Sequence, residues 1–297
     1  MTSMFRDDLL AGQRILVTGG GSGLGRELAD EFLRLGAEVH ICGRRQGVLE
    51  DAAAAMMATH GGKVVAHACD ITQPAMVEAM LDRAWSDHGP LTGLVNNAAG
   101  NIISPTEKLS PRGFDAVAGS VMHGSFYVTQ SCGKRWIAGG TRGSVLSILL
   151  PWVFNGSPYT VPSAMSKAAV HIMTKSLAME WARFGIRLNA IAAGTFPTPG
   201  AWQRLRPDLA ADGSDDDLSG HPMGRIGRMS ELRALAVFLL AEGCDYLTGA
   251  CIPLDGATTI ASGGNYHHLH SRSDEEWQRV RELAKSYSDR DKALRTV

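Results

Sequence analysis

Residues 18–25 read Thr18-Gly19-Gly20-Gly21-Ser22-Gly23-Leu24-Gly25 and decide the fold. This turn follows the apolar run at residues 14–17 and precedes a helical pattern at residues 26–35. Between a strand and a helix, such glycines let a pyrophosphate approach the backbone, and the helix N-terminus offers it free N–H groups. A glycine-rich helix entry without a ligand is the alternative. The predicted dinucleotide-binding residues here are Gly19, Gly21, Ser22, Gly23, Leu24 and Gly25.

Strand-like and helical patterns alternate along most of the chain. Apolar runs predict seven strands, at residues 14–17, 38–42, 64–68, 91–95, 144–149, 187–191 and 250–254. Helical periodicity lies between them, for example at residues 73–87, 114–136, 163–181 and 229–240. Such alternation predicts an α/β fold: one Rossmann-type, doubly wound parallel sheet with helices on both faces. Ligands of these sheets bind beyond the carboxyl ends of the strands.

Two regions lie outside this pattern. Residues 194–224 contain prolines and the acidic run 215–217, so we predict a substrate lid within a domain spanning residues 12–257. A surface insertion is the alternative. We predict that residues 258–297 are a C-terminal extension, and that its helix begins at the capping-box pattern Ser273-x-x-Glu276. Its apolar stripe is expected to pack on this protein or on a neighbouring subunit: Trp277, Val280, Leu283 and Tyr287.

Bulk composition narrows the possible partners and locations. The net charge of −1 implies no general attraction to nucleic acid or to anionic membranes. The five cysteines are scattered without a Cys-x-x-Cys motif, and neither a signal peptide nor a membrane-spanning run is apparent. A cytoplasmic protein is therefore expected. We also expect no metal site, because His67, His221 and the cluster at residues 267–270 lack converging ligands in the sequence.

The residues after the second and third strands bear on the cofactor. Arg44 and Arg45 stand where an acidic residue would accept hydrogen bonds from an adenosine ribose. Guanidinium groups instead suit a 2′-phosphate, so NADP is favoured over NAD. A solvated helix start is the alternative. Asp70 could accept a hydrogen bond from adenine and Ile71 could pack on its ring, while Asp70 could equally cap the next helix.

The run Asn96-Asn97-Ala98-Ala99-Gly100 follows the fourth strand, and with the glycine turn it resembles the short-chain dehydrogenase/reductase family. The resemblance covers residues 12 to about 257. It implies that Asn97 and Ala98 lie against the cofactor ribose and that Gly194, Thr195 and Phe196 face the nicotinamide. The family's active site is Tyr-x-x-x-Lys. Lys167 matches the lysine, which implies cofactor binding as well as catalysis, but Ser163 stands where the tyrosine should be.

Further segments resemble the 2,4-dienoyl-CoA reductases, especially the mitochondrial type. They include residues 96–107, 109–111 and 161–164. These enzymes also lack Tyr-x-x-x-Lys and keep a serine and a lysine, which correspond to Ser163 and Lys167. The resemblance implies that NADPH gives hydride to the far end of a conjugated diene. The resulting dienolate is held by hydrogen-bond donors and protonated on carbon. It also implies a homotetramer formed through the two long helices.

Two donors of that subfamily are replaced here. The resemblance puts Trp152 at the position of a tyrosine and His123 at that of an asparagine. We hypothesise that His123 acts as donor and acid, that Trp152 lines the acyl pocket, and that Tyr159 is a second candidate acid. Alternatively, His123 and Trp152 only pack. Two other functions stay open: a carbonyl reductase or alcohol dehydrogenase with a displaced acid, and a non-catalytic NADP-binding scaffold.

Overall fold

The computed structural model describes residues 4–197, 221–261, 273–276, 278–279 and 282. Its strands are β1 (Arg14–Thr18), β2 (Glu38–Gly43), β3 (Val64–Ala68), β4 (Gly93–Asn96), β5 (Gly143–Leu149), β6 (Ile186–Ala193) and β7 (Cys251–Leu254). They form a parallel seven-stranded sheet in the order β3-β2-β1-β4-β5-β6-β7. The Rossmann-type α/β fold expected from the alternating pattern is confirmed. The order reverses between β1 and β4, which is the usual ligand position in such sheets.

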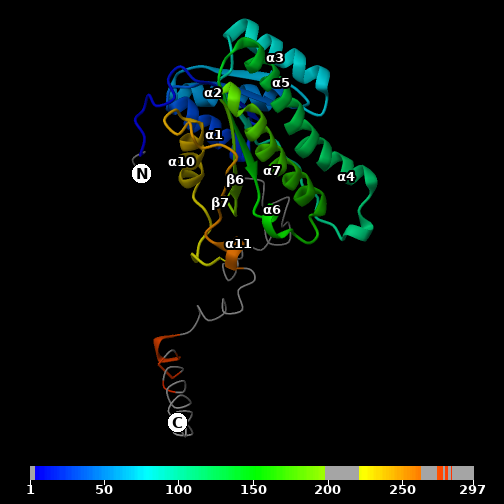
Figure 1. The fold of residues 1–297 in the computed structure, drawn as a ribbon, viewed down its shortest axis with the longest axis vertical. Coiled ribbons are helices and arrows are strands. Elements are labelled where there is room, and N and C mark those ends of the chain that lie inside the picture. Colours follow the sequence, from blue (N-terminus) through cyan, green and yellow to red (C-terminus); the bar gives the residue numbers. More distant parts are fainter. Residues whose placement is uncertain (1–3, 198–220, 262–272, 277, 280–281, 283–297) are drawn as a thin grey trace. The chain divides into compact units, whose positions relative to one another are not determined.

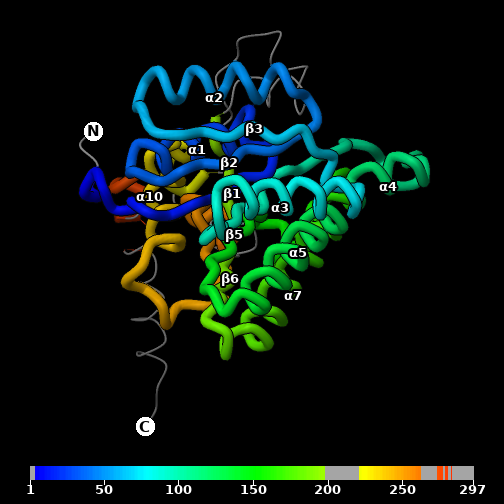
Figure 2. Tube along the Cα trace, turned by 90° about the horizontal axis from the view of Figure 1, so that it is seen from above, coloured from blue at the N-terminus to red at the C-terminus, as the bar shows by residue number. Residues whose placement is uncertain are grey.

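The helices alternate with the strands along the chain. The α-helices are α1 (Gly23–Arg34), α2 (Gln46–His60), α3 (Pro74–His88), α4 (Pro111–Ala118), α5 (Gly124–Gly139), α6 (Trp152–Asn155), α7 (Val161–Trp181), α10 (Met229–Leu240) and α11 (Thr258–Ala261). Short 3₁₀ segments are η1 (Thr106–Lys108) and η3 (Ala182–Phe184), and η2 (Gly119–His123) is a π-helix. Helices α1, α2 and α10 cover one face of the sheet, and α3, α5 and α7 cover the other (Figures 1 and 2).

Side chains of the strands alternate between two apolar cores. Val39 and Ile41 of β2 belong to the core under α1, α2 and α10. Cys42 of β2 belongs instead to the core under α3 and α5, with Trp136. Trp136 is fully buried and donates from Nε1 to the carbonyl oxygen of Leu91, 2.6 Å away. This bond engages the main chain just before β4, which begins at Gly93 rather than at Leu91 as predicted.

The helix predicted at residues 114–136 is divided into α4, η2 and α5. It begins earlier, at Pro111, where the hydroxyl of Ser110 accepts a hydrogen bond from the Gly113 N–H. Its π-helical turn ends at Gly124, where a Cβ atom would lie 2.6 Å from Cγ1 of Ile71. A side chain from the neighbouring segment thus occupies the space against the helix at this point, which periodicity in the sequence cannot reveal.

The chain divides into two units, residues 1–259 and 260–297. In the second unit, Ser273 and Glu276 form the predicted capping box: the Ser273 N–H donates to Glu276, and the Glu276 N–H donates to the Ser273 hydroxyl. The predicted apolar stripe of this extension lies outside the described side chains, and most of the predicted lid, residues 198–220, lies outside the described residues. No described helix is long and apolar enough to cross a membrane.

Candidate active site

Thr18 joins the glycine turn after β1 to the segment after β4. Its hydroxyl donates to the carbonyl oxygen of Val95 at 3.2 Å and accepts from the N–H groups of Asn97 and Ala98, both at 3.0 Å. The side-chain amide of Asn97 donates to the carbonyl oxygen of Thr18 at 3.0 Å. Because all these groups are paired with one another, Asn97 and Ala98 offer their backbone surface, rather than a free side-chain amide, to a ligand at this edge.

The glycines of this turn are required by close contacts and by positive φ angles at Gly19 and Gly23. Gly19 has φ +68°, and a Cβ atom there would lie 3.1 Å from Cα of Ala98. A Cβ atom at Gly25 would lie 2.5 Å from the carbonyl oxygen of Gly19. The two segments therefore touch backbone to backbone at the switch point of the sheet, where bulkier residues would separate them.

The N-terminus of α1 is open to an anion. Ser22 is the N-cap residue, has an extended backbone, and makes no side-chain hydrogen bond to the helix. The first N–H groups of α1 thus lack a capping partner, and the positive end of the helix dipole lies at the carboxyl edge of β1. This donor arrangement, together with the close turn at Gly19 and Gly25, fits a dinucleotide pyrophosphate.

The adenosine end of the predicted cofactor site is only partly supported. Arg44 and Arg45 are exposed at the end of β2, and no ion pair within the described part of the chain engages Arg44. Oδ1 of Asp70 accepts hydrogen bonds from the N–H and the hydroxyl of Thr72, at 3.0 and 2.8 Å. Asp70 therefore shapes the turn before α3. Ile71 is buried against Gly124, and its exposed fraction is 6%.

The nicotinamide end follows β6. The Gly194 N–H donates to the carbonyl oxygen of Leu254, and a Cβ atom on Gly194 would lie 2.8 Å from Cα of Asp255. The hydroxyl of Thr195 lies 3.3 Å from Nε2 of His221. The ring of Phe196 belongs to the core under α1 and α10, so it is not available to a bound cofactor.

Lys167 and Ser163 lie on the buried face of α7, with exposed fractions of 5% and 2%. Nζ of Lys167 donates to the carbonyl oxygen of Ile148 in β5, 2.5 Å away. Burial lowers the pKa of Lys167 from 10.5 to about 8, and no carboxylate among the described residues compensates for its charge. The hydroxyl of Ser163 has no hydrogen-bond partner among the described residues. A buried cation and a free hydroxyl on one helix face are groups that a ligand can use.

Trp152 and Tyr159 lie in the segment between β5 and α7. Trp152 is half-buried and is the first residue of α6. Tyr159 has φ +61°, a strained angle for a bulky residue, and its side chain is 59% exposed. Its carbonyl oxygen accepts a hydrogen bond from the N–H of Ser104 at 2.9 Å. This bond ties the segment after β4 to the segment before Ser163.

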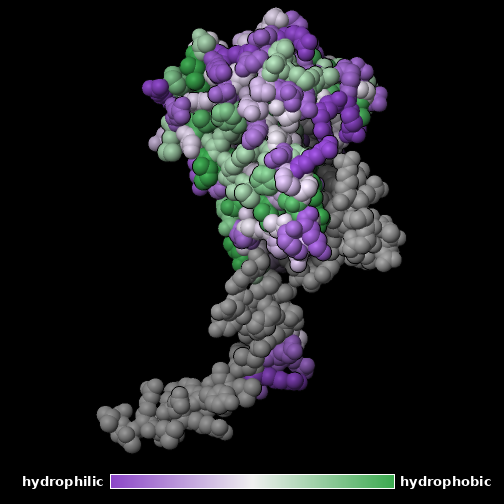
Figure 3. All heavy atoms as spheres, turned by 90° about the vertical axis from the view of Figure 1, so that its right-hand side faces the viewer, coloured by the Kyte–Doolittle hydropathy of each residue, from purple (hydrophilic) through white to green (hydrophobic). Residues whose placement is uncertain are grey.

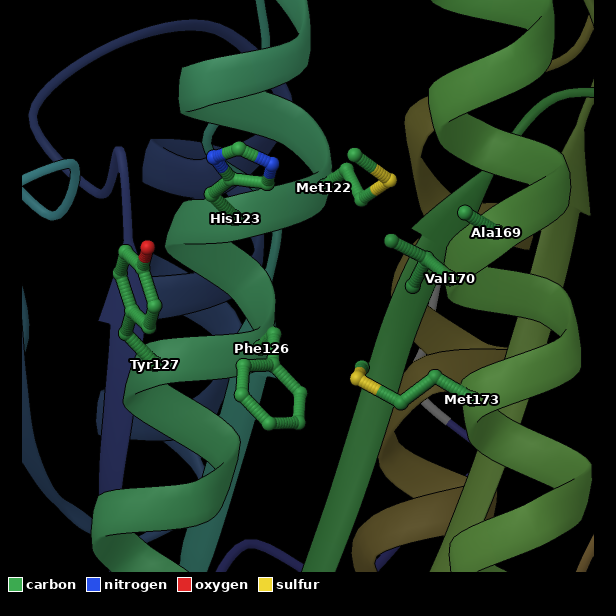
Figure 4. Close-up of a pocket in the computed structure, with 7 residues that line it drawn as sticks. All are labelled: Met122, His123, Phe126, Tyr127, Ala169, Val170 and Met173. Atoms are coloured by element: carbon green, nitrogen blue, oxygen red, sulfur yellow. The ribbon is translucent and has the colours of Figure 1, made fainter.

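His123 lies in a different group from Lys167 and Ser163. It is exposed at the end of η2 and lines a groove of about 360 Å³ between α5 and α7. The groove is lined by Met122, His123, Phe126, Tyr127, Ala169, Val170 and Met173 (Figure 4). Lys167 and Ser163 lie four residues apart on one face of α7, and His123 makes no hydrogen bond or ion pair with either of them within the described part of the chain.

Asn101 is a candidate that the sequence patterns did not single out. It comes directly after the Asn96–Gly100 run, at the carboxyl edge of β4. Its Oδ1 is buried and has no hydrogen-bond partner within the part of the chain that the structure describes. Three residues later, Ser104 bonds to Tyr159, so Asn101 lies on the segment adjoining the one that leads to Ser163. An amide oxygen without a partner at this edge is an acceptor that a bound ligand or water can satisfy. The sequence signal was only its position beyond a strand.

Comparison with known proteins gives the family context. The family model described as Enoyl-(Acyl carrier protein) reductase matches residues 19–259. Probable 2,4-dienoyl-CoA reductase 3 of Caenorhabditis elegans is 38% identical over 294 residues, covering 97% of this chain and 94% of the relative. Gluconate 5-dehydrogenase of Burkholderia cenocepacia, solved with NADP and tartrate, is 31% identical with a TM-score of 0.78, covering 86% of this chain and 98% of that one.

One expectation about the subfamily needs correction. Peroxisomal 2,4-dienoyl-CoA reductase of Danio rerio is 29% identical over 272 residues, covering 90% of this chain and 88% of the relative. The relatives whose names state a compartment are peroxisomal. The comparison therefore supports the 2,4-dienoyl-CoA reductases as a group, and the resemblance to their mitochondrial type in particular was wrong.

Proposed function

This chain belongs to the short-chain dehydrogenase/reductase family of NAD(P)-dependent oxidoreductases, and from that membership we propose that it reduces 2,4-dienoyl-CoA thioesters or similar conjugated acyl thioesters with NADPH. One observation carries the proposal. Lys167 and Ser163 are retained on the buried face of α7, although the residue four before the lysine is not a tyrosine. Such a site suits charge developing on a thioester oxygen better than proton exchange with an alcohol. Relatives 35–38% identical are named 2,4-dienoyl-CoA reductases.

The residues of this chain divide into a cofactor half and a substrate half. When bound, NADPH supplies the hydride. The glycine turn and the N-terminus of α1 hold the pyrophosphate, and Arg44 pairs with the 2′-phosphate. Lys167 binds the nicotinamide ribose through its buried ammonium, and the backbone at Gly194 and Thr195 supports the ring. These roles rest on three observations: the uncapped N-terminus of α1, the exposed guanidinium of Arg44, and the buried ammonium of Lys167, which has no carboxylate beside it among the described residues.

In the substrate half, hydrogen-bond donors hold the thioester oxygen while it becomes negatively charged. Ser163 offers a free hydroxyl, and Asn101 offers the N–H groups of its side-chain amide, whose oxygen is buried and unpaired among the described residues. Each preorganised donor of this kind contributes about 3 kcal/mol to stabilisation of a transition state. Trp152 packs along the acyl chain. Tyr159, on the strained turn before α7, delivers the proton if its side chain turns inward.

A two-wavelength assay tests the proposal. The chain is mixed with NADPH and a 2,4-dienoyl-CoA, and the absorbance of the diene and of NADPH is followed together. We expect both to fall at equal molar rates. Loss of NADPH only with ketones or aldehydes would instead identify a carbonyl reductase with a displaced acid. Fluorescence-detected NADPH binding without turnover on either class would identify a non-catalytic scaffold.

Arg44→Glu is expected to change the cofactor preference from NADPH to NADH. The variant loses a charge-assisted pair with the 2′-phosphate and gains an acceptor for ribose hydroxyls, so KM for NADPH rises about 100-fold while KM for NADH falls. Initial rates with both cofactors measure the effect. Arg45→Gln, the neighbouring exposed arginine, is the control and should change either KM only a few-fold if Arg44 is the contact. If the ratio of the two KM values is unchanged in Arg44→Glu, Arg44 does not determine the preference for NADPH over NADH.

Asn101→Ala and His123→Ala separate the two candidate donors. Because Asn101 lies on the segment that is bonded to the turn before Ser163, whereas His123 is exposed in the groove, we expect kcat to fall about 100-fold in Asn101→Ala and less than about twofold in His123→Ala. Single-turnover kinetics at saturating NADPH provide the measurement. The opposite order of effects would restore His123 as donor and acid.

We also propose that the chain forms a homotetramer in the cytoplasm. Exposed apolar residues follow one side of α7, where Met165, Ile172 and Met179 are 55–78% exposed. Figure 3 views the side of the molecule that carries α4 and α7 and shows apolar residues among polar ones there. All five cysteines are free, which is typical of proteins in a reducing compartment. Size-exclusion chromatography with light scattering of the wild type and of Ile172→Lys tests the assembly, since the charge should dissociate it.

A further inference from the structure

A second polar cluster lies at the opposite edge of the sheet from the active site. Glu38 and His40 are on β2, His67 is on β3, and His88 is the last residue of α3. Figure 2 shows β2 and β3 side by side, and the ring of His88 at the end of α3 meets the ring of His40 edge-on, with 4.9 Å between the ring centroids. Glu38 opens its strand and the end of α3 leads toward the start of β4, so the cluster lies toward the amino ends of the strands. His40 is fully buried and His67 is 8% exposed.

Three polar atoms of this cluster are close together without being hydrogen-bonded. Nε2 of His40 lies 3.3 Å from Oε1 of Glu38, and Nδ1 of His88 lies 2.8 Å from the same oxygen. Each of these atoms is buried, and none has a hydrogen bond of acceptable geometry. Oε1 of Glu38 also forms an ion pair with Lys63, so the two imidazole nitrogens are the atoms left unpaired among the described residues, at about 1–3 kcal/mol each. A cation between them would satisfy all three.

The remaining histidine supports this arrangement. Nδ1 of His40 and Nε2 of His67 are 2.9 Å apart, so one proton is shared between these rings. With the proton on Nδ1 of His40, its Nε2 keeps a lone pair directed toward Glu38. Histidines that bind metals commonly donate their other N–H in this way.

We propose that Glu38, His40 and His88 bind a zinc ion, with His67 as the residue that positions His40. The three ligand atoms all lie within 4.8 Å of one another. Ligands of a tetrahedral zinc ion are about 3.4 Å apart, so small side-chain rotations suffice, and water takes the fourth position. Two imidazole nitrogens and one carboxylate oxygen favour zinc and its neighbours over Mg²⁺ or Ca²⁺. The ion would join β2 to the end of α3, remote from hydride transfer.

Lys63 occupies the carboxylate oxygen that the proposed zinc ion would use. Its Nζ lies 3.2 Å from Oε1 of Glu38, and its side chain is 53% exposed. Lys63 can therefore turn into solvent when an ion enters, but its positive charge opposes the ion. Replacing Lys63 with methionine should accordingly tighten zinc binding, about tenfold for the loss of one neighbouring charge.

The test uses the full chain without an affinity tag and with His267, His268 and His270 replaced by asparagine, because those tail histidines could bind zinc themselves. After treatment with a chelator, ZnCl₂ is titrated by calorimetry, and CoCl₂ by visible absorption. We expect one equivalent of zinc, a tetrahedral cobalt spectrum and a higher midpoint of thermal unfolding. MgCl₂ and CaCl₂ should have no effect.

Matched variants decide where the ion lies. His88→Gln should weaken zinc binding at least about 100-fold, and His67→Asn about 10- to 100-fold, with a changed cobalt spectrum. His60→Gln is the control, since His60 also faces a carboxylate, Asp30 at 3.1 Å, but lies on α2 outside the cluster. Absence of stoichiometric binding would overturn the proposal. So would binding that survives His88→Gln, or Lys63→Met protein that binds zinc no more tightly.

Discussion

Replacing Lys167 with methionine is expected to abolish turnover and to make the folded protein more stable. The ammonium is 5% exposed, and its burial lowers the pKa from 10.5 to about 8. At 1.36 kcal/mol per pKa unit, holding this charge costs about 3 kcal/mol of stability at neutral pH, as an order of magnitude. Methionine fills a similar volume without the charge. The same change removes the cofactor contact, so kcat/KM should fall about 100-fold or more.

The pH dependence of the free energy of unfolding tests the same prediction. Between about pH 8 and pH 10.5 the unfolded chain binds a proton at this lysine that the folded chain has released. The free energy of unfolding contributed by Lys167 therefore rises with pH across this window in the wild type, and the rise should be absent in Lys167→Met. Urea unfolding at pH 7, 9 and 10 measures it.

Lys175→Met is the matched control, because Lys175 is exposed on the same helix. It should leave both turnover and the pH profile close to those of the wild type. A Lys167→Met protein that retains turnover, or that is several kcal/mol less stable at pH 7, would show that the buried ammonium has been assigned the wrong role.

Gly25→Ala is expected to have the second largest effect. A Cβ atom at this position would lie 2.5 Å from the carbonyl oxygen of Gly19, a backbone atom that cannot turn aside, and it would also strike the side chain of Asn97. Separating the two segments should cost about 3 kcal/mol of stability and weaken NADPH binding at least about tenfold. Denaturant unfolding and fluorescence titration with NADPH measure the two effects.

Gly47→Ala provides the comparison for that glycine. Gly47 lies in the first turn of α2, and a Cβ atom there would meet nothing within 4 Å. Its replacement should change stability by less than about 1 kcal/mol, because alanine is the better helix former. If Gly25→Ala and Gly47→Ala are equally stable and bind NADPH equally well, Gly25 is not needed for the close contact between the segments after β1 and β4.

The fold was predictable because its signals are local. Apolar runs of the right length placed every strand to within about two residues, and residues 229–240 formed the predicted helix without change. The division of residues 111–139 into α4, η2 and α5 was not predictable. It depends on Ile71 packing against Gly124, two residues far apart in the sequence, and helical periodicity carries no record of that contact.

The two halves of the candidate site differ in the same way. The glycine turn, Arg44 and Lys167 follow strands or lie at motif spacings, so the sequence could indicate them. Which side of a helix faces the ligand depends on packing, and His123 proved to lie in the groove between α5 and α7. Asn101 became a candidate only because its oxygen is buried without a partner, a property that exists in three dimensions alone.

Transfer of deuterium from labelled NADPH tests the central claim most directly. The wild-type chain is incubated with a 2,4-dienoyl-CoA and NADPH that carries deuterium at the transferable position, and the product is analysed by mass spectrometry. We predict one deuterium on the carbon at the far end of the former diene, one proton from water, and an intact thioester. A product reduced at the carbonyl carbon, or recovery of unlabelled diene from protein that binds NADPH, would contradict it.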